Sequence, residues 1–252
     1  MTDIKILKIG GSVLTDKTRL ESANIEEIDR IAAEIAGHDS GLILVHGAGS
    51  FGHIHAKKYS LVERFSSEGV LETHRSVVRL NDLVVESLRM AGSSPVPVHP
   101  FSCTILKDGR IEVMETGPVI EMVKRGLVPV LHGDVAMDRL RGAGIVSGDQ
   151  LVSSLARSLR PEIVALGTAV DGVIFNGRPL AEVRREDLAK IGSELGGSAG
   201  VDVTGGMKGK LEELLDLADR GVRSMIFNAK KKGMIERVLA GERAGTLVEG
   251  KA

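Results

Sequence analysis

The 252-residue sequence is poor in aromatic residues and has almost no cysteine. It contains one cysteine (Cys103), no tryptophan, five phenylalanines and one tyrosine. A single cysteine forms neither an internal disulfide nor a cysteine-based zinc cluster, and it is typical of a reducing compartment, so we expect a cytoplasmic location. The shortage of aromatic rings argues against a base-stacking surface for single-stranded nucleic acid.

The sequence also lacks an excess of either charge. It has 33 basic and 34 acidic residues, for a formal net charge of -1. Such a balance gives no overall attraction to nucleic acid or to an anionic membrane, so we expect neither as a partner. No stretch approaches 18 consecutive apolar residues, and the first residues lack the basic and apolar segments of a signal peptide.

Short apolar runs alternate with segments of helical periodicity along the chain. Runs typical of buried strands occupy residues 4–9, 42–45, 96–98, 128–131, 163–166 and 225–227, and helical spacing covers 25–35, 71–88, 118–124, 148–159 and 207–220. This alternation predicts one α/β domain with a mostly parallel sheet and helices on both faces. An Asp-Gly turn predicts a hairpin over 105–111, and the polar stretch 184–200 predicts an exposed loop.

Glycine is abundant, at 31 residues, and it clusters after the apolar runs. Loops of this kind occupy 10–12, 47–52, 133–134 and 167–168. In a parallel sheet these loops share the edge formed by the carboxyl ends of the strands, where ligands bind. Glycine there lets backbone N–H groups approach an anion, so the loops predict a site for more than one phosphate, although any one loop fits a tight turn equally well. The GxGxxG pattern at 47–52 lacks the following acidic strand of a nicotinamide site.

Three lysines favour a phosphate ligand. Lys8 lies inside the apolar run 4–9, where a buried ammonium group is costly unless an anion meets it. Lys17 follows a few residues later. Lys210 lies in the first turn of a predicted helix, where a cation is unfavourable beside the helix dipole and a bound phosphate would remove the conflict. Lys17 and Lys210 taken singly are also compatible with solvated surface lysines.

Two further side chains are candidates for the site. Asp149 opens a predicted helix, so it serves either as a helix cap or as a carboxylate that holds the lysines. His53 ends the second glycine loop and could donate to a substrate anion, whereas His38, His74 and His99 have no comparable setting. No spacing typical of metal ligands occurs, so we expect no protein-held metal and expect Mg²⁺ to arrive with a nucleotide.

Several motifs together resemble the amino acid kinase family. They are KIGGS at 8–12, TGGMxxK at 204–210 and the glycine loops between them. Within that family, HGAGSFGH at 46–53, SVLTDK at 12–17 and Gly245-Thr246 are similar to the isopentenyl phosphate kinases, so the resemblance spans nearly the whole chain. It implies a three-layer αβα sandwich over residues 1–252, with substrate in the N-terminal half (about 1–160), ATP in the C-terminal half (about 161–252), and a homodimer.

The resemblance also implies a role for each motif residue. Lys8 and Lys210 would neutralise the transferring phosphoryl group with help from Lys17, and Asp149 would organise the lysines. The nucleotide side would comprise Gly10, Gly11, Ser12, Gly49, Asp171 and Gly206, and the substrate phosphate would lie against Ala48, Gly52, His53 and Gly148. Two positions depart from the family pattern, because Ala169 and Gln150 stand where aspartate is common.

The implied reaction converts isopentenyl phosphate and ATP to isopentenyl diphosphate and ADP. The attacking phosphate oxygen is already ionised near neutral pH, so cations and aligned N–H donors matter more than a general base. Apolar residues within 59–88 could line a pocket for the hydrocarbon tail, although we favour core packing for them; they are Phe65, Val70, Leu71, Val77 and Val78. The alternatives are a fosfomycin-type phosphonate kinase and a non-catalytic nucleotide-binding or storage protein on the same fold.

Overall fold

The computed structural model describes residues 3–16, 18–195 and 206–250, and its centre is an eight-stranded sheet. The strand order is β12-β14-β13-β9-β1-β2-β6-β3, and the pairings are parallel apart from that of β13 with β14. The strands are β1 (Lys5–Ile9), β2 (Leu42–His46), β3 (Pro95–Val98), β6 (Val128–His132), β9 (Ile163–Thr168), β12 (Glu182–Val183), β13 (Ser224–Asn228) and β14 (Thr246–Val248).

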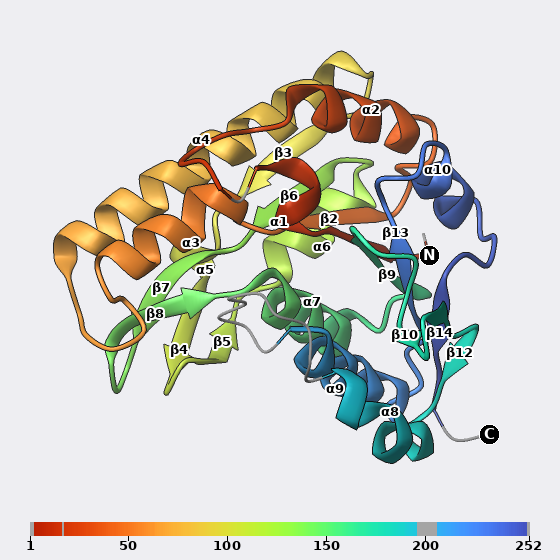
Figure 1. Ribbon diagram of the computed structural model, residues 1–252. Helices are drawn as coiled ribbons and strands as arrows, with labels where there is room; N and C mark the ends of the chain where they lie inside the picture. The colour runs from red at the N-terminus through yellow and green to blue at the C-terminus, as the bar shows by residue number, and fades with distance from the viewer. Residues whose placement is uncertain (1–2, 17, 196–205, 251–252) are drawn as a thin grey trace.

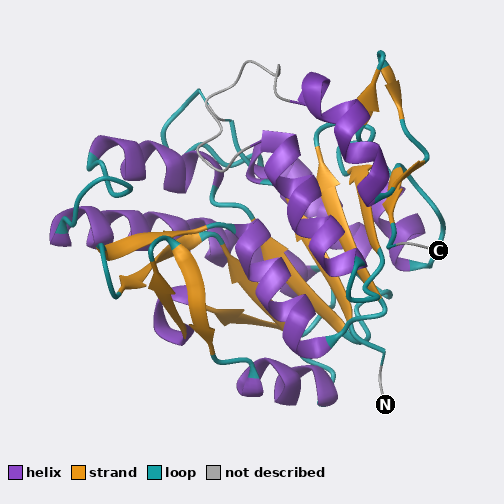
Figure 2. Ribbon diagram, turned by 90° about the horizontal axis from the view of Figure 1, so that it is seen from below, coloured by secondary structure: helices purple, strands orange, loops and turns teal. Residues whose placement is uncertain are grey.

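Helices cover both faces of this sheet, which gives the predicted three-layer sandwich (Figures 1 and 2). One face packs on α2 (Ile25–Ile35), α4 (Ser67–Met90) and α10 (Met234–Leu239). The other packs on α6 (Gly117–Lys124), α7 (Gly148–Leu159) and α9 (Gly206–Ala218), with α8 (Leu188–Leu195) beside α9. Successive residues of a strand point to opposite faces, so Leu7 and Ile9 pack towards α2 and α4, whereas Ile6 packs towards α7. Lys8 therefore points to the α7 face.

A smaller sheet lies at one end of the sandwich, in the order β5-β4-β7-β8. The hairpin predicted at 105–111 is confirmed, because β4 (Thr104–Lys107) pairs with β5 (Arg110–Met114). Asp108 and Gly109 between them both have positive φ, as a tight hairpin turn requires. The second hairpin, β7 (Asp134–Asp138) with β8 (Gly142–Val146), was not predicted. The remaining elements are α1 (Gly11–Leu14), α3 (Gly49–Lys58), α5 (Pro100–Cys103), β10 (Ile174–Phe175), β11 (Arg178–Pro179) and a 3-10 turn at Arg185–Asp187.

Two loop predictions are wrong. Within the predicted loop 184–200, residues 185–195 form the 3-10 turn and α8, because Ile191 is buried and Leu188 packs on the core, although the segment is polar overall. Residues 196–200 lie outside the described residues. The glycine run at 47–53 becomes helical at Gly49, where α3 begins, and Phe51 and Ala56 give that helix its buried side. None of the helices that the structure describes is long and apolar enough to cross a membrane.

Candidate active site

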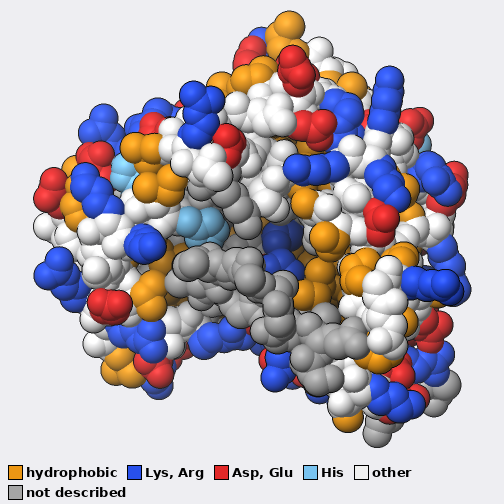
Figure 3. All heavy atoms as spheres, in the orientation of Figure 1, with side chains coloured by type: hydrophobic (Ala, Val, Ile, Leu, Met, Phe, Trp, Pro, Cys, Tyr) orange, Lys and Arg blue, Asp and Glu red, His pale blue; other side chains and the backbone are white. Residues whose placement is uncertain are grey.

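A cleft of about 990 Å³ opens at the carboxyl edge of the large sheet. The loops after β1, β2 and β6 and the end of β9 all line it, and these four strands are neighbours in the sheet. The prediction that the glycine loops share one edge is therefore confirmed. Figure 3 shows a hollow near the middle of one face with basic side chains at its base.

The first two glycine loops touch each other backbone to backbone. A Cβ atom at Gly11 would lie 2.4 Å from the backbone nitrogen of Gly49, and a Cβ atom at Gly47 would lie 2.5 Å from that of Gly11. Neither approach leaves room for a side chain. The absence of side chains therefore brings the N–H groups of two loops together on the cleft wall, where they can meet an anion.

Lys8, Asp149 and Lys210, which we call the lysine cluster, meet at the base of the cleft. The Lys8 Nζ atom lies 2.7 Å from Oδ1 of Asp149, and the Lys210 Nζ atom lies 3.3 Å from Oδ2. Burial on its own raises the pKa of Asp149, but the charges of Lys8 and Lys210 outweigh burial and hold that pKa below its ordinary value. Ser147 caps α7 by accepting from the Gln150 N–H, so the cap interpretation of Asp149 is wrong and the lysine-holding one fits.

Most of the other predicted residues line the same cleft. They are Gly10, Gly11, Ser12, Ala48, Gly49, Gly52, His53 and Gly148. Asp171 does not line it in the described part of the chain. Its carboxylate accepts from Lys231 and Asn228, and the hydrogen bond from Lys231 lowers its pKa. Gly206 begins α9. Lys17, like Thr204 and Gly205 of the TGGM motif, lies outside the described residues.

One part of the cleft wall carries aliphatic side chains together with polar ones from the same segments, Lys57, Ser60 and Glu63. Five aliphatic side chains from α3, the following segment, α4 and β8 line it, namely Ala56, Leu61, Val62, Val77 and Ile145. Of the residues suggested for a hydrocarbon pocket, Val77 is the one in this wall, whereas Phe65 and Leu71 are exposed and belong neither to the cleft nor to the core.

Thr73 is a buried polar residue of the cleft lining. It is only 1% exposed, lines the cleft, and its Oγ1 atom has no hydrogen-bond partner among the described residues. A buried hydroxyl without a partner costs free energy, and a ligand oxygen in the cleft would offset that cost.

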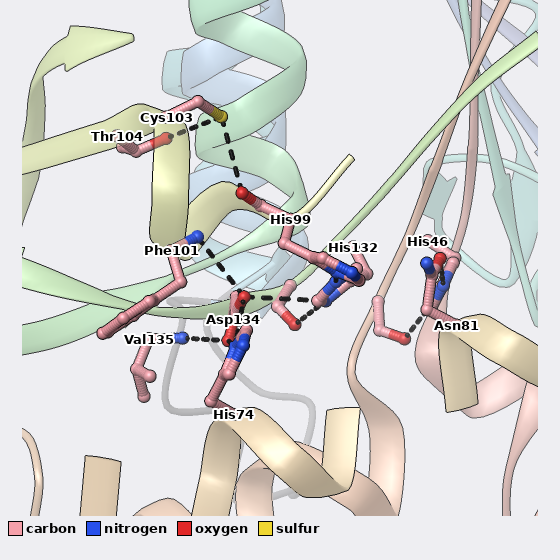
Figure 4. A network of polar contacts seen from close by, with 12 residues as sticks. His46, His74, Asn81, His99, Phe101, Cys103, Thr104, His132, Asp134 and Val135 are labelled. Atoms are coloured by element: carbon pink, nitrogen blue, oxygen red, sulfur yellow. Dashed lines mark hydrogen bonds and ion pairs between the residues drawn. The ribbon is translucent and has the colours of Figure 1, made fainter. Parts of the chain in front are cut away.

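A second group of polar side chains, which we call the histidine cluster, comprises His46, His74, His99, His132 and Asp134 (Figure 4). The His74 Nδ1 atom lies 3.0 Å from both carboxylate oxygens of Asp134, and His99 Nδ1 lies 3.0 Å from His132 Nε2. Sequence reasoning missed this cluster and set His74 and His99 aside. A signal was present, because His46, His99 and His132 each end or directly follow a predicted apolar strand.

The pKa values of the histidines in this cluster are shifted in different directions. Desolvation lowers the pKa of His46 and holds that of His132 well below its ordinary value. The hydrogen bond that His74 donates to the Asp134 carboxylate raises the pKa of His74, and burial raises the pKa of Asp134. The two innermost rings are therefore neutral near pH 7, and they act as oriented hydrogen-bonding groups.

The described residues offer no group of three or more His, Cys, Asp or Glu side chains that could hold a metal ion. Mg²⁺ usually binds through one or two carboxylates together with substrate phosphates, so its ordinary mode does not need such a group.

Comparison with known proteins gives one consistent family. The sequence pattern of the Amino acid kinase family matches residues 3–228. The isopentenyl phosphate kinase of Methanothermobacter thermautotrophicus is 40% identical over 98% of this chain and 99% of its own length, and that of Methanocaldococcus jannaschii is 36% identical over 98% of each. A solved isopentenyl phosphate kinase structure superposes with a TM-score of 0.83 at 34% identity, over 97% of this chain and 99% of the other. The product complex of the T. acidophilum isopentenyl phosphate kinase superposes with a TM-score of 0.78 at 27% identity, over 98% of this chain and 100% of the other.

Proposed function

The chain belongs to the amino acid kinase family, and from that premise we propose that it transfers the γ-phosphoryl group of ATP to isopentenyl phosphate. The products are isopentenyl diphosphate and ADP. The observation that carries the proposal is one cleft with the lysine cluster at its base, glycine loops on its wall, and five aliphatic side chains from α3, the segment after it, α4 and β8 (the aliphatic wall) in its lining.

The chemical difficulty of this reaction is the approach of two polyanions. Two ammonium groups and one carboxylate leave the lysine cluster with a net positive charge. Lys8 and Lys210 come from β1 and α9, on either side of Asp149, so they can contact the transferring group while Asp149 holds their spacing. The nucleophile needs no base, and catalysis rests on positioning and on charge stabilisation.

The substrate end supplies binding in two parts. Ala48, Gly52, His53 and Gly148 would hold the phosphate, with His53 donating to it. The aliphatic wall would receive the five-carbon tail, which favours a hydrocarbon over the small polar body of a phosphonate such as fosfomycin. The Thr73 hydroxyl would donate to a ligand oxygen between the two parts.

Finer assignments form part of the same proposal. The N-terminal half, about residues 1–160, would hold substrate, and the C-terminal half, about 161–252, would hold the nucleotide near Asp171 and Gly206. Gly10, Gly11, Ser12 and Gly49 would contact ATP phosphates, with Lys17 assisting the transfer. Mg²⁺ would enter on the ATP phosphates and neutralise part of their charge. We also propose a cytoplasmic homodimer, whose mass can be read by light scattering.

The test is ADP release with Mg-ATP and, separately, isopentenyl phosphate, dimethylallyl phosphate, fosfomycin and UMP. We expect turnover on the isoprenoid monophosphates, and Lys8→Ala should lower kcat about 100-fold or more because one transition-state cation is lost. Lys5→Ala is the matched control, since Lys5 lies at the other end of the same strand and donates to the Leu239 carbonyl. Turnover of the phosphonate alone, or ATP binding without turnover on any acceptor, would contradict the proposal.

A further inference from the structure

His46 and His132 are fully buried beside the cleft and have no part in the phosphoryl transfer described above. Each is the last residue of its strand, directly before a glycine that lines the cleft. The two residues are register partners in β2 and β6, and their rings stack with centroids 5.7 Å apart. Figure 4 shows both rings within the histidine cluster.

Both rings make the same contact with the backbone. The Nδ1 atom of His46 lies 3.2 Å from the Gly47 carbonyl oxygen, and that of His132 lies 3.1 Å from the Gly133 carbonyl oxygen. A carbonyl oxygen only accepts hydrogen bonds, so Nδ1 carries the proton in each neutral ring. In each of the two adjacent loops, the histidine Nδ1–H group therefore donates to the carbonyl oxygen of the glycine that follows the histidine.

The other ring nitrogen of each histidine is fixed as well. His132 Nε2 lies 3.0 Å from His99 Nδ1, which donates to it. His46 Nε2 lies 3.0 Å from the Oδ1 position of the Asn81 amide, whose Nδ2 atom has no hydrogen-bond partner among the described residues. Because Nδ1 of His46 already donates to Gly47, a neutral ring accepts at Nε2, and an amide can turn its NH₂ end towards an acceptor. These contacts hold both ring planes, and they select the Nδ1–H form in His132 directly and in His46 with the Asn81 amide turned so that Nδ2 faces the ring.

The contact with the carbonyl determines where the next N–H points. In a trans peptide the C=O and N–H bonds point in opposite directions, so a Gly47 carbonyl held by His46 directs the Ala48 N–H away from the ring. Ala48 lines the cleft. Gly133 packs on that same group, because a Cβ atom there would lie 3.2 Å from the Ala48 nitrogen. Glycine peptides turn easily, and a turned peptide would present a carbonyl oxygen to the phosphate in place of an N–H group.

We propose that His46 and His132 are positioning residues for phosphoryl transfer, each donating Nδ1–H to the glycine carbonyl that follows it and so keeping the Ala48 N–H directed at the substrate phosphate. His46 acts on the peptide itself, and His132 acts on the loop that packs against it. The inference rests on the proposed function, because it takes the phosphate at Ala48 to be that of the acceptor substrate.

Two substitutions of nearly equal shape test the donor. In His46→Asn the amide nitrogen can occupy the place of Nδ1, whereas His46→Leu has the same branching and no donor. We expect the asparagine variant to stay within about threefold of wild type, and the leucine variant to raise KM for isopentenyl phosphate about tenfold, with KM for ATP unchanged. The His132 pair should follow the same order with a smaller change. A merely structural role would change both KM values together and would show no rescue by asparagine.

The tautomer can be read in the unsubstituted protein, so the test does not depend on how the variants fold. Nitrogen-15 NMR of labelled histidine at pH 7.5 should show two buried rings protonated at Nδ1. Protonation at Nε2, or equal kinetics for the asparagine and leucine variants, would overturn the inference while wild-type turnover of isopentenyl phosphate leaves the proposed function intact. Absence of that turnover in wild type would overturn both.

Discussion

The lysine cluster and the histidine cluster border the same cleft, and both bury polar groups that are costly to remove from water. In the lysine cluster, Asp149 offsets the desolvation of Lys8 and Lys210, and the charges remain. In the histidine cluster, burial instead keeps His46 and His132 neutral, and each ring satisfies both nitrogens with hydrogen bonds. The comparison separates two tasks: the lysine cluster supplies positive charge, and the histidine cluster supplies neutral groups that orient the backbone by hydrogen bonds.

Asp149→Asn should have the largest effect, because it removes the carboxylate that pairs with both ammonium groups of the lysine cluster. Two ammonium groups would then lie close together with no carboxylate between them, which costs about 3 kcal/mol of unfolding free energy and moves both cations from their places. We expect kcat to fall about 100-fold.

Urea unfolding and ADP release measure the two effects of Asp149→Asn separately. Asp219→Asn is the matched control, since Asp219 is 40% exposed and pairs with Arg185 at the surface, where loss of a pair changes stability by less than about 1 kcal/mol. A normal kcat in Asp149→Asn would show that the carboxylate does not organise the lysines.

The charged side of the cleft could be predicted from sequence for a physical reason. A lysine inside an apolar strand is anomalous wherever that strand lies in the sheet, and glycine loops after parallel strands share an edge whatever the strand order. Lys8 and the four loops therefore needed no knowledge of which strands are neighbours, whereas for Asp149 the sequence allows both a helix cap and a partner of the lysines.

Predicting the histidine cluster, in contrast, requires knowing which strands are neighbours in the sheet. His46, His132 and His99 meet because β2, β6 and β3 are adjacent, although they are far apart along the chain. The β7–β8 hairpin carries Asp134 and Ile145 into the cleft wall, and its apolar pattern is too short and too interrupted by glycine to predict a hairpin. Helix α8 was missed for a related reason, since polar composition concealed the few apolar residues that pack.

Acidification should lower the free energy of unfolding through the neutral rings of His46 and His132, by less than the loss expected for Asp149→Asn. The folded-state pKa of His46 and of His132 lies below the unfolded value near 6.5, so below that pH the unfolded chain binds more protons and stability falls. Each ring contributes at most about 1.4 kcal/mol per pH unit. His74, whose pKa is raised by Asp134, acts in the opposite direction, because its contribution is full below pH 6.5 and is lost as the pH rises through its folded value.

The measurement is the unfolding free energy between pH 7.5 and 5.5 for wild type and for a His46→Asn, His132→Asn double variant. The lowered pKa values of His46 and His132 act against the raised ones of His74 and Asp134, and the balance predicts a net loss of up to about 1 kcal/mol per pH unit in wild type. The double variant removes the two rings and should show a flat or reversed slope. Equal slopes would mean that these rings become charged in the folded protein, and the contrast with the lysine cluster would fail.

The smallest effect is expected at Thr73, which differs from both clusters because its buried hydroxyl has no hydrogen-bond partner among the described residues. Thr73→Val keeps the shape and removes the hydroxyl, so it should stabilise the ligand-free protein by about 1 kcal/mol. The same change should raise KM for isopentenyl phosphate several-fold, since the ligand loses a donor. Thr73→Ser keeps the hydroxyl and should retain the wild-type KM, which separates hydrogen bonding from packing. If Thr73→Val instead lowers stability and leaves KM unchanged, the hydroxyl serves the fold, and the aliphatic wall of the cleft binds its ligand by shape alone.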